Sequence, residues 1–574
     1  MSIANPAPVA IFGNHKWPVA DHSGNKESQP LVICGMSLLR LSCAFSLLSL
    51  LPLSPVWGQT PVVSEASEPR SAYPLWGNLA AGSYGVGFRR VFRYDASRTW
   101  ETTRDFKGVF SPDLNGRPVQ INVWYPAIVK GKSPCMRFAD YVEQTAPEAF
   151  SKFNAIVKNH NRRDAVDSVP RDQVAALQKT SMNAYLDATP AEGHFPTVLY
   201  FGGLDAAINS NVILAEYLAS HGYIVASISL MGPTDDQTFQ SRTPGDLDAS
   251  VRDMEFAWSA LGENSNTDKG KLAVVGHSVG GIEAALFGMR NANVSAVVAL
   301  DGTYGFPGLS SVLTQSYGYA ARENACGIPG PQKRARSAGR RAVRPYGRGV
   351  FRHCDRTFVT IQKMHHSDFT SFAMVGEYFH TPITSNYPLN GWNRETAKSG
   401  HEQMCKIILA FLDAKVRGDA NAMTALTAAI EHAAGGVLRH EDGTPPPPSP
   451  LESAALVKEK GLTETKALFT QICGDRGVGT CIDGDRFNTW GYNLLGQNRP
   501  ADALAIFELA AWAHPTSANA QDSLADGYLG VGDKERAKKA VQRAIELAPE
   551  DPLLSTDAKV SFLAEETTRL RKIQ

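Results

Sequence analysis

The stretch VVGHSVGGIEAAL, residues 274–286, contains a serine in a setting that could make it a nucleophile. An apolar run precedes the Gly-His-Ser-Val-Gly turn and a helix of small residues follows it, which is the context in which such a serine reacts. Gly276 and Gly280 lack the Cβ atoms that would clash in a tight strand-to-helix turn. We therefore predict that Ser278 is exposed at the apex, above a helix amino terminus. The alternative is a polar residue in an ordinary glycine-rich turn.

An acyl-transferring serine needs a base and an acid, and candidates for both follow Ser278 in the sequence. An imidazole must accept the hydroxyl proton and a carboxylate must hold the imidazole, in the chain order serine, acid, histidine. Asp301 ends the apolar strand SAVVALD, at the sheet edge where catalytic loops gather. His365 and His366 follow RTFVTIQKM and are the candidate bases. The alternatives are a turn-forming Asp-Gly pair and surface histidines.

Two backbone N–H groups are candidates for stabilising the oxyanion that such a reaction forms. Val279 follows the serine and begins the expected helix. Leu204 lies in the loop FGGLDA after an apolar strand, although that loop could also be a plain glycine turn. This chemistry needs no metal and no organic cofactor, and we expect none.

The pattern around these residues predicts an α/β fold. From Tyr84 to Tyr125 apolar and polar residues alternate, as in half-buried antiparallel strands. After His194, continuous apolar strands alternate with helices, which indicates a mostly parallel sheet covered on both faces. The expected elements are, in order, FPTVLYFGG, VILAEYLASHG, YIVASISL, a helix over 247–261, KLAVVGHS, GGIEAALFGM, SAVVALDG and a closing helix around HEQMCKIILAFLDAKVRG.

A basic segment interrupts this pattern over residues 321–355. It is rich in arginine and has no acidic residue between Glu323 and Asp355, and no strand can be recognised in it. A surface insertion without regular structure is the first interpretation. A nucleic-acid patch is disfavoured because aromatic residues are scarce and no binding motif accompanies it. A shifted reading frame is the third interpretation.

The chain of 574 residues is long enough for two to four domains, and its 57 basic residues equal its 57 acidic ones. This balance gives no reason to expect a nucleic-acid partner. From Met36, the sequence MSLLRLSCAFSLLSLLPLSPVWGQTP has the pattern of a secretory signal peptide, and we expect the true start there. Its apolar core is shorter than the ~20 residues of a spanning helix. We therefore expect an exported protein, periplasmic or extracellular, with no transmembrane segment after signal removal.

Export would remove Cys34 and Cys43 and leave six cysteines in a compartment that permits disulfides. Cys473 and Cys481 flank the loop GDRGVGT and are the candidate pair, the alternative being small buried thiols. No Cys-X-X-Cys pair or histidine-rich cluster suggests a structural metal.

A separate helical module follows the Pro-rich stretch HEDGTPPPPSP, residues 440–450, which is typical of a stiff linker. Four positions recur 34 residues later in similar form: Ala503, Phe507, Ala510 and Pro515 become Ala537, Val541, Ala544 and Pro549. This spacing predicts two tetratricopeptide repeats. A helix from about Leu451 to Cys473 is expected to pack on the first repeat, because two repeats alone bury too little.

The catalytic unit, from about Tyr84 to Gly418, resembles the platelet-activating factor acetylhydrolase-like members of the α/β-hydrolases, near the dienelactone hydrolases. The resemblance rests on GHSVGG, LASHGYIVASI, Asp301 placed 23 residues after Ser278, and HSDFTSF. His366, with Phe369 and Phe372 after it, matches the family's catalytic histidine, which favours His366 over His365. The family's usual His-Gly before the oxyanion leucine is Gly202-Gly203 here.

The resemblance implies an exported serine esterase that forms an acyl-enzyme at Ser278 and acts on a small-molecule or lipid ester, including short acyl groups at the sn-2 position of phospholipids. A second hypothesis is a catalytically impaired hydrolase-fold scaffold whose repeats bind a protein partner. A dienelactone-type enzyme would usually carry a cysteine in place of Ser278. The predicted organisation is a leader and signal peptide (1–58), an α/β-hydrolase domain (72–439), the linker (440–450) and a helical domain (451–574).

Overall fold

A computed structural model describes the chain over residues 73–101, 115–129, 133–235, 243–302, 355–361, 363–381, 391–431, 437–441, 443, 447–474 and 477–573. The chain divides into Met1–Ala66 and Ser67–Gln574. The predicted leader, the signal peptide and the basic segment up to residue 354 lie outside the described residues. Of the described helices, not one combines the length and the apolar character needed to cross a bilayer.

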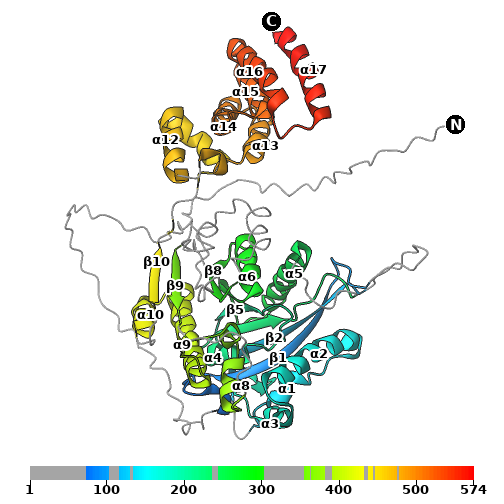
Figure 1. Cartoon of the computed structure of the whole chain (residues 1–574), viewed down its shortest axis with the longest axis vertical. Helices are drawn as coiled ribbons and strands as arrows, with labels where there is room; N and C mark the ends of the chain where they lie inside the picture. The colour runs from blue at the N-terminus through cyan, green and yellow to red at the C-terminus, as the bar shows by residue number, and fades with distance from the viewer. Residues whose placement is uncertain are drawn as a thin grey trace, which may run out of the picture. The chain divides into compact units, whose positions relative to one another are not determined.

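An eight-stranded sheet is the centre of the described part before residue 302 (Figure 1). The strand order is β3-β1-β2-β6-β5-β7-β8, with β4 paired to β2. β2 is antiparallel to both β1 and β6, whereas the pairs β6-β5, β5-β7 and β7-β8 are parallel. The strands are β1 (Gly85–Asp95), β2 (Arg117–Ile128), β3 (Tyr185–Leu186), β4 (Thr189–Pro190), β5 (Phe195–Phe201), β6 (Ile224–Ile228), β7 (Thr267–His277) and β8 (Val294–Leu300). The predicted mostly parallel α/β sheet with an antiparallel edge is confirmed.

Both faces of the sheet are covered, so its central strands are apolar on both sides. In β7, Val275 belongs to the core under α4 (Val212–Ser220) and α9 (Arg394–Leu412), whereas Val274 belongs to the core under α5 (Pro244–Leu261) and α6 (Val279–Arg290). Successive side chains of a strand point to opposite faces, which places these neighbours in different layers. This explains the continuous apolar runs that predicted buried parallel strands.

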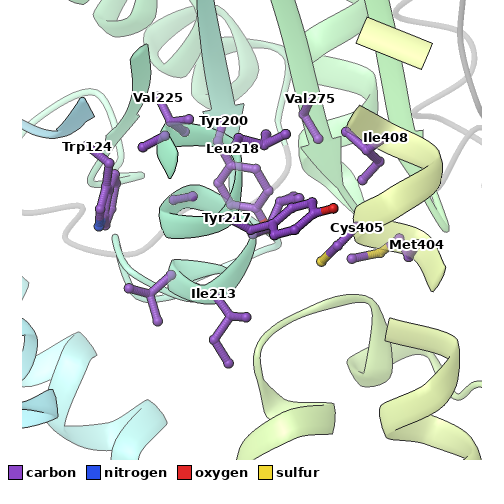
Figure 2. Packing of buried hydrophobic residues seen from close by; sticks show 14 of the residues in the cluster. Trp124, Tyr200, Ile213, Tyr217, Leu218, Val225, Val275, Met404, Cys405 and Ile408 are labelled. Carbon is purple, nitrogen blue, oxygen red and sulfur yellow. The ribbon is translucent and has the colours of Figure 1, made fainter. Parts of the chain in front are cut away.

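The core on the α4 side is shown in Figure 2. The ring of Tyr217 from α4 lies beside Cys405 and Met404 of α9, and Val275 lies over them. Cys405 is fully buried, and burial raises the pKa of its thiol and that of the Tyr217 hydroxyl far above their usual values.

α9 and the π-helical turn Asp413–Arg417 end at Gly418, which has a positive φ. The predicted closing helix is thus confirmed.

Three helices that the sequence did not reveal lie between β2 and β5. They are α1 (Phe138–Val142), α2 (Ser151–Ser168) and α3 (Val174–Lys179). A fourth difference is the start of α5, which begins at Pro244 and not at Leu247. Thr243 caps it by accepting the N–H of Asp246, whose carboxylate accepts the N–H of Thr243 in return.

A strand precedes the candidate histidines, as expected. It is β9 (Arg356–Thr360), and it pairs antiparallel with β10 (Val437–Glu441). The first two residues of the predicted linker, His440 and Glu441, are therefore in a strand. Helix α10 (Ala420–Glu431) precedes this strand in the chain.

The C-terminal region is all helical in its described residues. Its helices are α11 (Pro450–Lys460), α12 (Leu462–Cys473), α13 (Gly484–Gly496), α14 (Pro500–Ala513), α15 (Ala518–Gly530), α16 (Lys534–Leu547) and α17 (Thr556–Ile573). The single helix predicted over Leu451 to Cys473 is wrong, because Gly461 breaks it at φ +84. Its expected packing is confirmed, since Ala454 and Phe469 share a core with Phe507.

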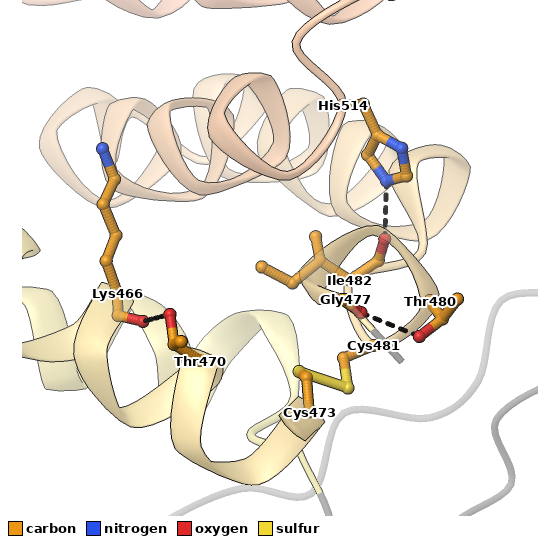
Figure 3. Close-up of a disulfide and its surroundings, with 8 residues drawn as sticks. All are labelled: Lys466, Thr470, Cys473, Gly477, Thr480, Cys481, Ile482 and His514. Carbon is orange, nitrogen blue, oxygen red and sulfur yellow. Dashed lines mark hydrogen bonds between the residues drawn. A yellow bond between two sulfur atoms is a disulfide. The ribbon is translucent and has the colours of Figure 1, made fainter. Parts of the chain in front are cut away.

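The candidate cysteines are bridged. Cys473 at the end of α12 forms a disulfide with Cys481, and the loop after it is held by His514, whose Nε2 donates to the backbone oxygen of Ile482 at 2.6 Å (Figure 3). Cys135 and Cys405 are free thiols. Cys326 and Cys354 lie outside the described residues.

Candidate active site

Ser278 occupies a strained turn between β7 and α6. Its φ of 56° and ψ of −120° lie in a region that a residue with a side chain rarely adopts, at a cost of about 1–3 kcal/mol. A Cβ on Gly276 would stand 2.0 Å from the backbone oxygen of Gly280, and one on Gly280 would stand 2.2 Å from that of Gly202. The turn therefore requires both glycines. The N–H of Ser278 donates to the Leu300 oxygen at 3.0 Å, which ties the turn to the end of β8.

Asp301 follows β8 and holds His366. Nδ1 of His366 donates to Oδ2 of Asp301 at 2.5 Å. The carboxylate side chain is 10 % exposed and the imidazole 33 % exposed, so the acid is enclosed while the base stays accessible. A proton on Nδ1 leaves Nε2 as the acceptor, which is the tautomer that a general base needs.

His365 does not share this position. Its backbone N–H donates to the Asp368 carboxylate at 2.6 Å, and its ring meets the edge of Trp392. Trp392 Nε1 also donates to Asp368, and burial raises the pKa of that carboxyl. The two histidines therefore have different contacts: His365 packs within its own loop, against Asp368 and Trp392, whereas His366 binds Asp301.

His277 is a site residue that the sequence reasoning missed. Its Nε2 donates to the backbone oxygen of His366 at 2.9 Å, and the two rings lie 4.6 Å apart between centroids. The only signal in the sequence was its place directly before Ser278. His277 joins the serine turn to the histidine loop, so Ser278, Asp301 and His366 are brought to one edge of the sheet. Within the described residues, no hydrogen bond joins the Ser278 hydroxyl to the His366 ring; in ligand-free enzymes such bonds are often long.

The loop that carries Leu204 lies against the serine turn. A Cβ on Gly203 would stand 3.5 Å from the Ser278 Cβ, and the loop closes on itself through the Ala206 N–H and the Gly203 oxygen at 3.1 Å. Val279 is the first residue of α6, a position whose N–H has no carbonyl partner within the helix. The loop that carries Leu204 and the first residue of α6, Val279, thus both lie at the serine turn.

Helix α2 holds this loop from outside. The Arg163 guanidinium donates to the Asp205 oxygen, and Asp164 Oδ2 accepts the N–H of Ala207 at 2.8 Å. Burial raises the pKa of the Asp164 carboxyl to about 6. Helix α2 therefore anchors the loop that carries Leu204.

Across the described ranges, no cluster of three or more His, Cys, Asp or Glu side chains is arranged to hold a metal ion.

Two comparisons with known proteins found similarities to this chain. The chain matches the family described as Chlorophyllase over residues 161–315, a span that includes Leu204, Ser278 and Asp301 but not His366. Among solved structures, it is similar to a ferulic acid esterase from Streptomyces cinnamoneus, with 19 % identity, a TM-score of 0.42, and coverage of 59 % of this chain and 93 % of that one. None of the curated proteins compared with the chain matches it. Ser278 and Asp301 thus lie within the segment of the α/β domain that is similar to the Chlorophyllase family.

Proposed function

We propose that this protein is a serine carboxylic-ester hydrolase in which Ser278, His366 and Asp301 act as the catalytic triad. The observation that carries the proposal is the 2.5 Å hydrogen bond between Asp301 and His366 at the sheet edge where the strained Ser278 turn begins. A strained serine, an oriented imidazole and an enclosed carboxylate form the arrangement required for acyl transfer.

The reaction proceeds in two steps. Ser278 Oγ attacks the ester carbonyl while Nε2 of His366 takes its proton, and the N–H groups of Leu204 and Val279 stabilise the oxyanion. His366 then returns the proton to the departing alcohol, which leaves an acyl group on Ser278. Water, deprotonated by His366, attacks this acyl-enzyme, and the released carboxylic acid frees the serine with its proton restored.

The substrate proposed from the resemblance is an ester with a short acyl chain, such as the sn-2 acyl group of a phospholipid. We also propose that the protein is exported, because the segment after Met36 has the pattern of a signal peptide. The Chlorophyllase match supports an ester substrate without choosing among esters.

The C-terminal helices support a second role, binding of a protein partner through tetratricopeptide repeats. Residues 34 positions apart occupy equivalent buried sites, with Ala503 and Phe507 in α14 matched by Ala537 and Val541 in α16. Repeats of paired helices commonly present a concave binding surface. If pull-down partners of the full chain are unchanged after deletion of the residues beyond Pro450, this role is excluded.

Labelling with a fluorophosphonate, followed by peptide mapping, tests the esterase proposal directly. We expect the label on the peptide that contains Ser278, and no label on the Ser278→Ala variant. The same variant should lose hydrolysis of p-nitrophenyl acetate. Equal turnover by the variant and the unaltered protein would exclude the proposed mechanism.

A further inference from the structure

A cavity with both apolar and polar walls lies beside the candidate active site, between α2 and two loops that carry candidate site residues. Its volume is about 200 Å³, and its wall includes Ala207, three residues after Leu204, and Ser367, directly after His366. Pockets that enclose a whole small ligand usually measure ~300–1,000 Å³. The cavity is therefore sized for one part of a substrate.

Two buried amides in the wall have unused hydrogen-bonding capacity. Asn161 of α2 is 1 % exposed, and its Nδ2 donates to the backbone oxygen of Tyr141, but its Oδ1 has no partner in the described part of the chain. Asn209, 7 % exposed, makes no side-chain hydrogen bond to any residue that the structure describes. Leaving a buried polar group unpaired costs about 1–3 kcal/mol, which a ligand could recover.

The wall offers both acceptors and donors of hydrogen bonds. Asn161 Oδ1 and the carboxyl groups of Asp164 and Asp167 can accept, and hydroxyl groups such as that of Ser367 can donate or accept. Among the described residues that line the wall there is no lysine, arginine or histidine. Asp164 already accepts one bond, from the N–H of Ala207. A ligand that donates hydrogen bonds and carries no negative charge suits this wall, whereas a phosphate or carboxylate would be repelled.

We propose that this cavity binds an uncharged, hydroxylated part of the ester, about the size of glycerol. The inference rests on the proposed esterase function and narrows its substrate class. The hydroxyl groups can belong to the alcohol or to the acyl part of the ester, since both present the same donors to the wall.

A matched control for Asn161 lies on the same helix. Asn154, seven residues earlier, is 6 % exposed, its Nδ2 donates to the Gln144 oxygen at 2.9 Å, and its Oδ1 also has no partner in the described residues. The two asparagines therefore have the same local role in holding α2. Only Asn161 lines the cavity.

The test measures ligand binding by saturation-transfer NMR on the full chain carrying Ser278→Ala, so that no ester is consumed. Two pairs of esters are compared: glyceryl monoacetate with propyl acetate, and ethyl 3-hydroxybutyrate with ethyl butyrate. The hydroxylated member of at least one pair is expected to bind about tenfold more tightly, as one or two new hydrogen bonds would give. Asn161→Ala should remove most of this preference and Asn154→Ala should retain it.

The pair that shows the preference identifies the hydroxylated part as alcohol or acyl. No preference in either pair, equal losses in the two asparagine variants, or tighter binding of 1-acetylglycerol 3-phosphate would overturn the inference. Hydrolysis of p-nitrophenyl acetate separates the two proposals. If the chain prefers the hydroxylated ester but Ser278 is not needed for turnover of p-nitrophenyl acetate, the cavity proposal stands and the esterase proposal fails. If turnover depends on Ser278 but no preference is seen, the esterase proposal stands and the cavity proposal fails.

Discussion

Nε2 of His277 donates a hydrogen bond to the backbone oxygen of His366, at 2.9 Å. This bond links the residue before the candidate nucleophile to the candidate base, across 89 residues of sequence. His277 is 6 % exposed and its ring lies against that of His366, so it acts as a positioning residue for the imidazole.

Replacing His277 with Phe removes this hydrogen bond and keeps an aromatic ring in place. We expect kcat for p-nitrophenyl acetate to fall about tenfold, the equivalent of ~1.4 kcal/mol, with KM unchanged, because the base is held less firmly while binding is not altered. His277→Gln retains an N–H donor and should restore most of kcat. If His277→Phe and His277→Gln lower kcat by the same factor, the hydrogen bond from residue 277 does not contribute to kcat.

Asp301→Asn keeps the shape of the acid but changes its charge. An amide can donate to Nδ1 and so favours the wrong tautomer, for which a fall in kcat of about 10⁴ is expected. Steady-state kinetics with p-nitrophenyl acetate measures the loss. Asp355→Asn, an exposed carboxylate before β9, is the control and should change kcat little. A loss below tenfold for Asp301→Asn would argue against its role as the acid.

The sheet could be predicted because its strands are buried on both faces, which leaves continuous apolar runs such as FPTVLYF. The order of Ser278, Asp301 and His366 could be predicted because a serine in a strand-turn-helix setting of an α/β pattern is followed by its acid and then by its histidine. Helix α2 was missed for a physical reason. Its inward positions include Asn154 and Asn161 beside Phe153 and Val157, so the apolar stripe that marks an amphipathic helix is interrupted.

The role of His277 depends on a contact between loops far apart in the sequence, which no local pattern reveals. The break at Gly461 was missed for a different reason. A glycine within a helical pattern is tolerated at a cost of about 1 kcal/mol, and only the backbone conformation shows that this one ends α11. The predicted domain boundaries stay predictions.

Asp164 should make stability depend on pH. Its pKa is raised from 3.8 to about 6, so the fold favours the protonated form: the stabilisation is fully present below pH 3.8 and is lost as pH rises through 6. A third of the side chain is exposed, and solvent screening limits the effect to about 1 kcal/mol.

Asp164→Asn cannot titrate and still offers an acceptor to Ala207. The free energy of unfolding is measured with urea at pH 4 and at pH 7.5. From the lower to the higher pH it should fall by about 1 kcal/mol less in this variant than in the unaltered protein. Asp172→Asn, an exposed carboxylate beyond the end of α2, should keep the full decline. Identical pH dependence in the Asp164 variant and the unaltered protein would contradict the assigned burial.

Two glycines of α13 provide opposite tests of the packing in the C-terminal helices. A Cβ on Gly491 would stand 2.3 Å from the buried ring of Phe507 in α14, whereas one on Gly496 would meet nothing within 4 Å. Gly491→Ala should lower the free energy of unfolding by about 1–3 kcal/mol, because the ring has no room to move. Gly496→Ala should raise it by about 0.5 kcal/mol, because alanine loses less backbone entropy in a helix. Calorimetry of residues 447–574 compared with the full chain would assign both shifts to this region. Equal effects of the two substitutions would mean that α13 does not pack on α14 through Gly491.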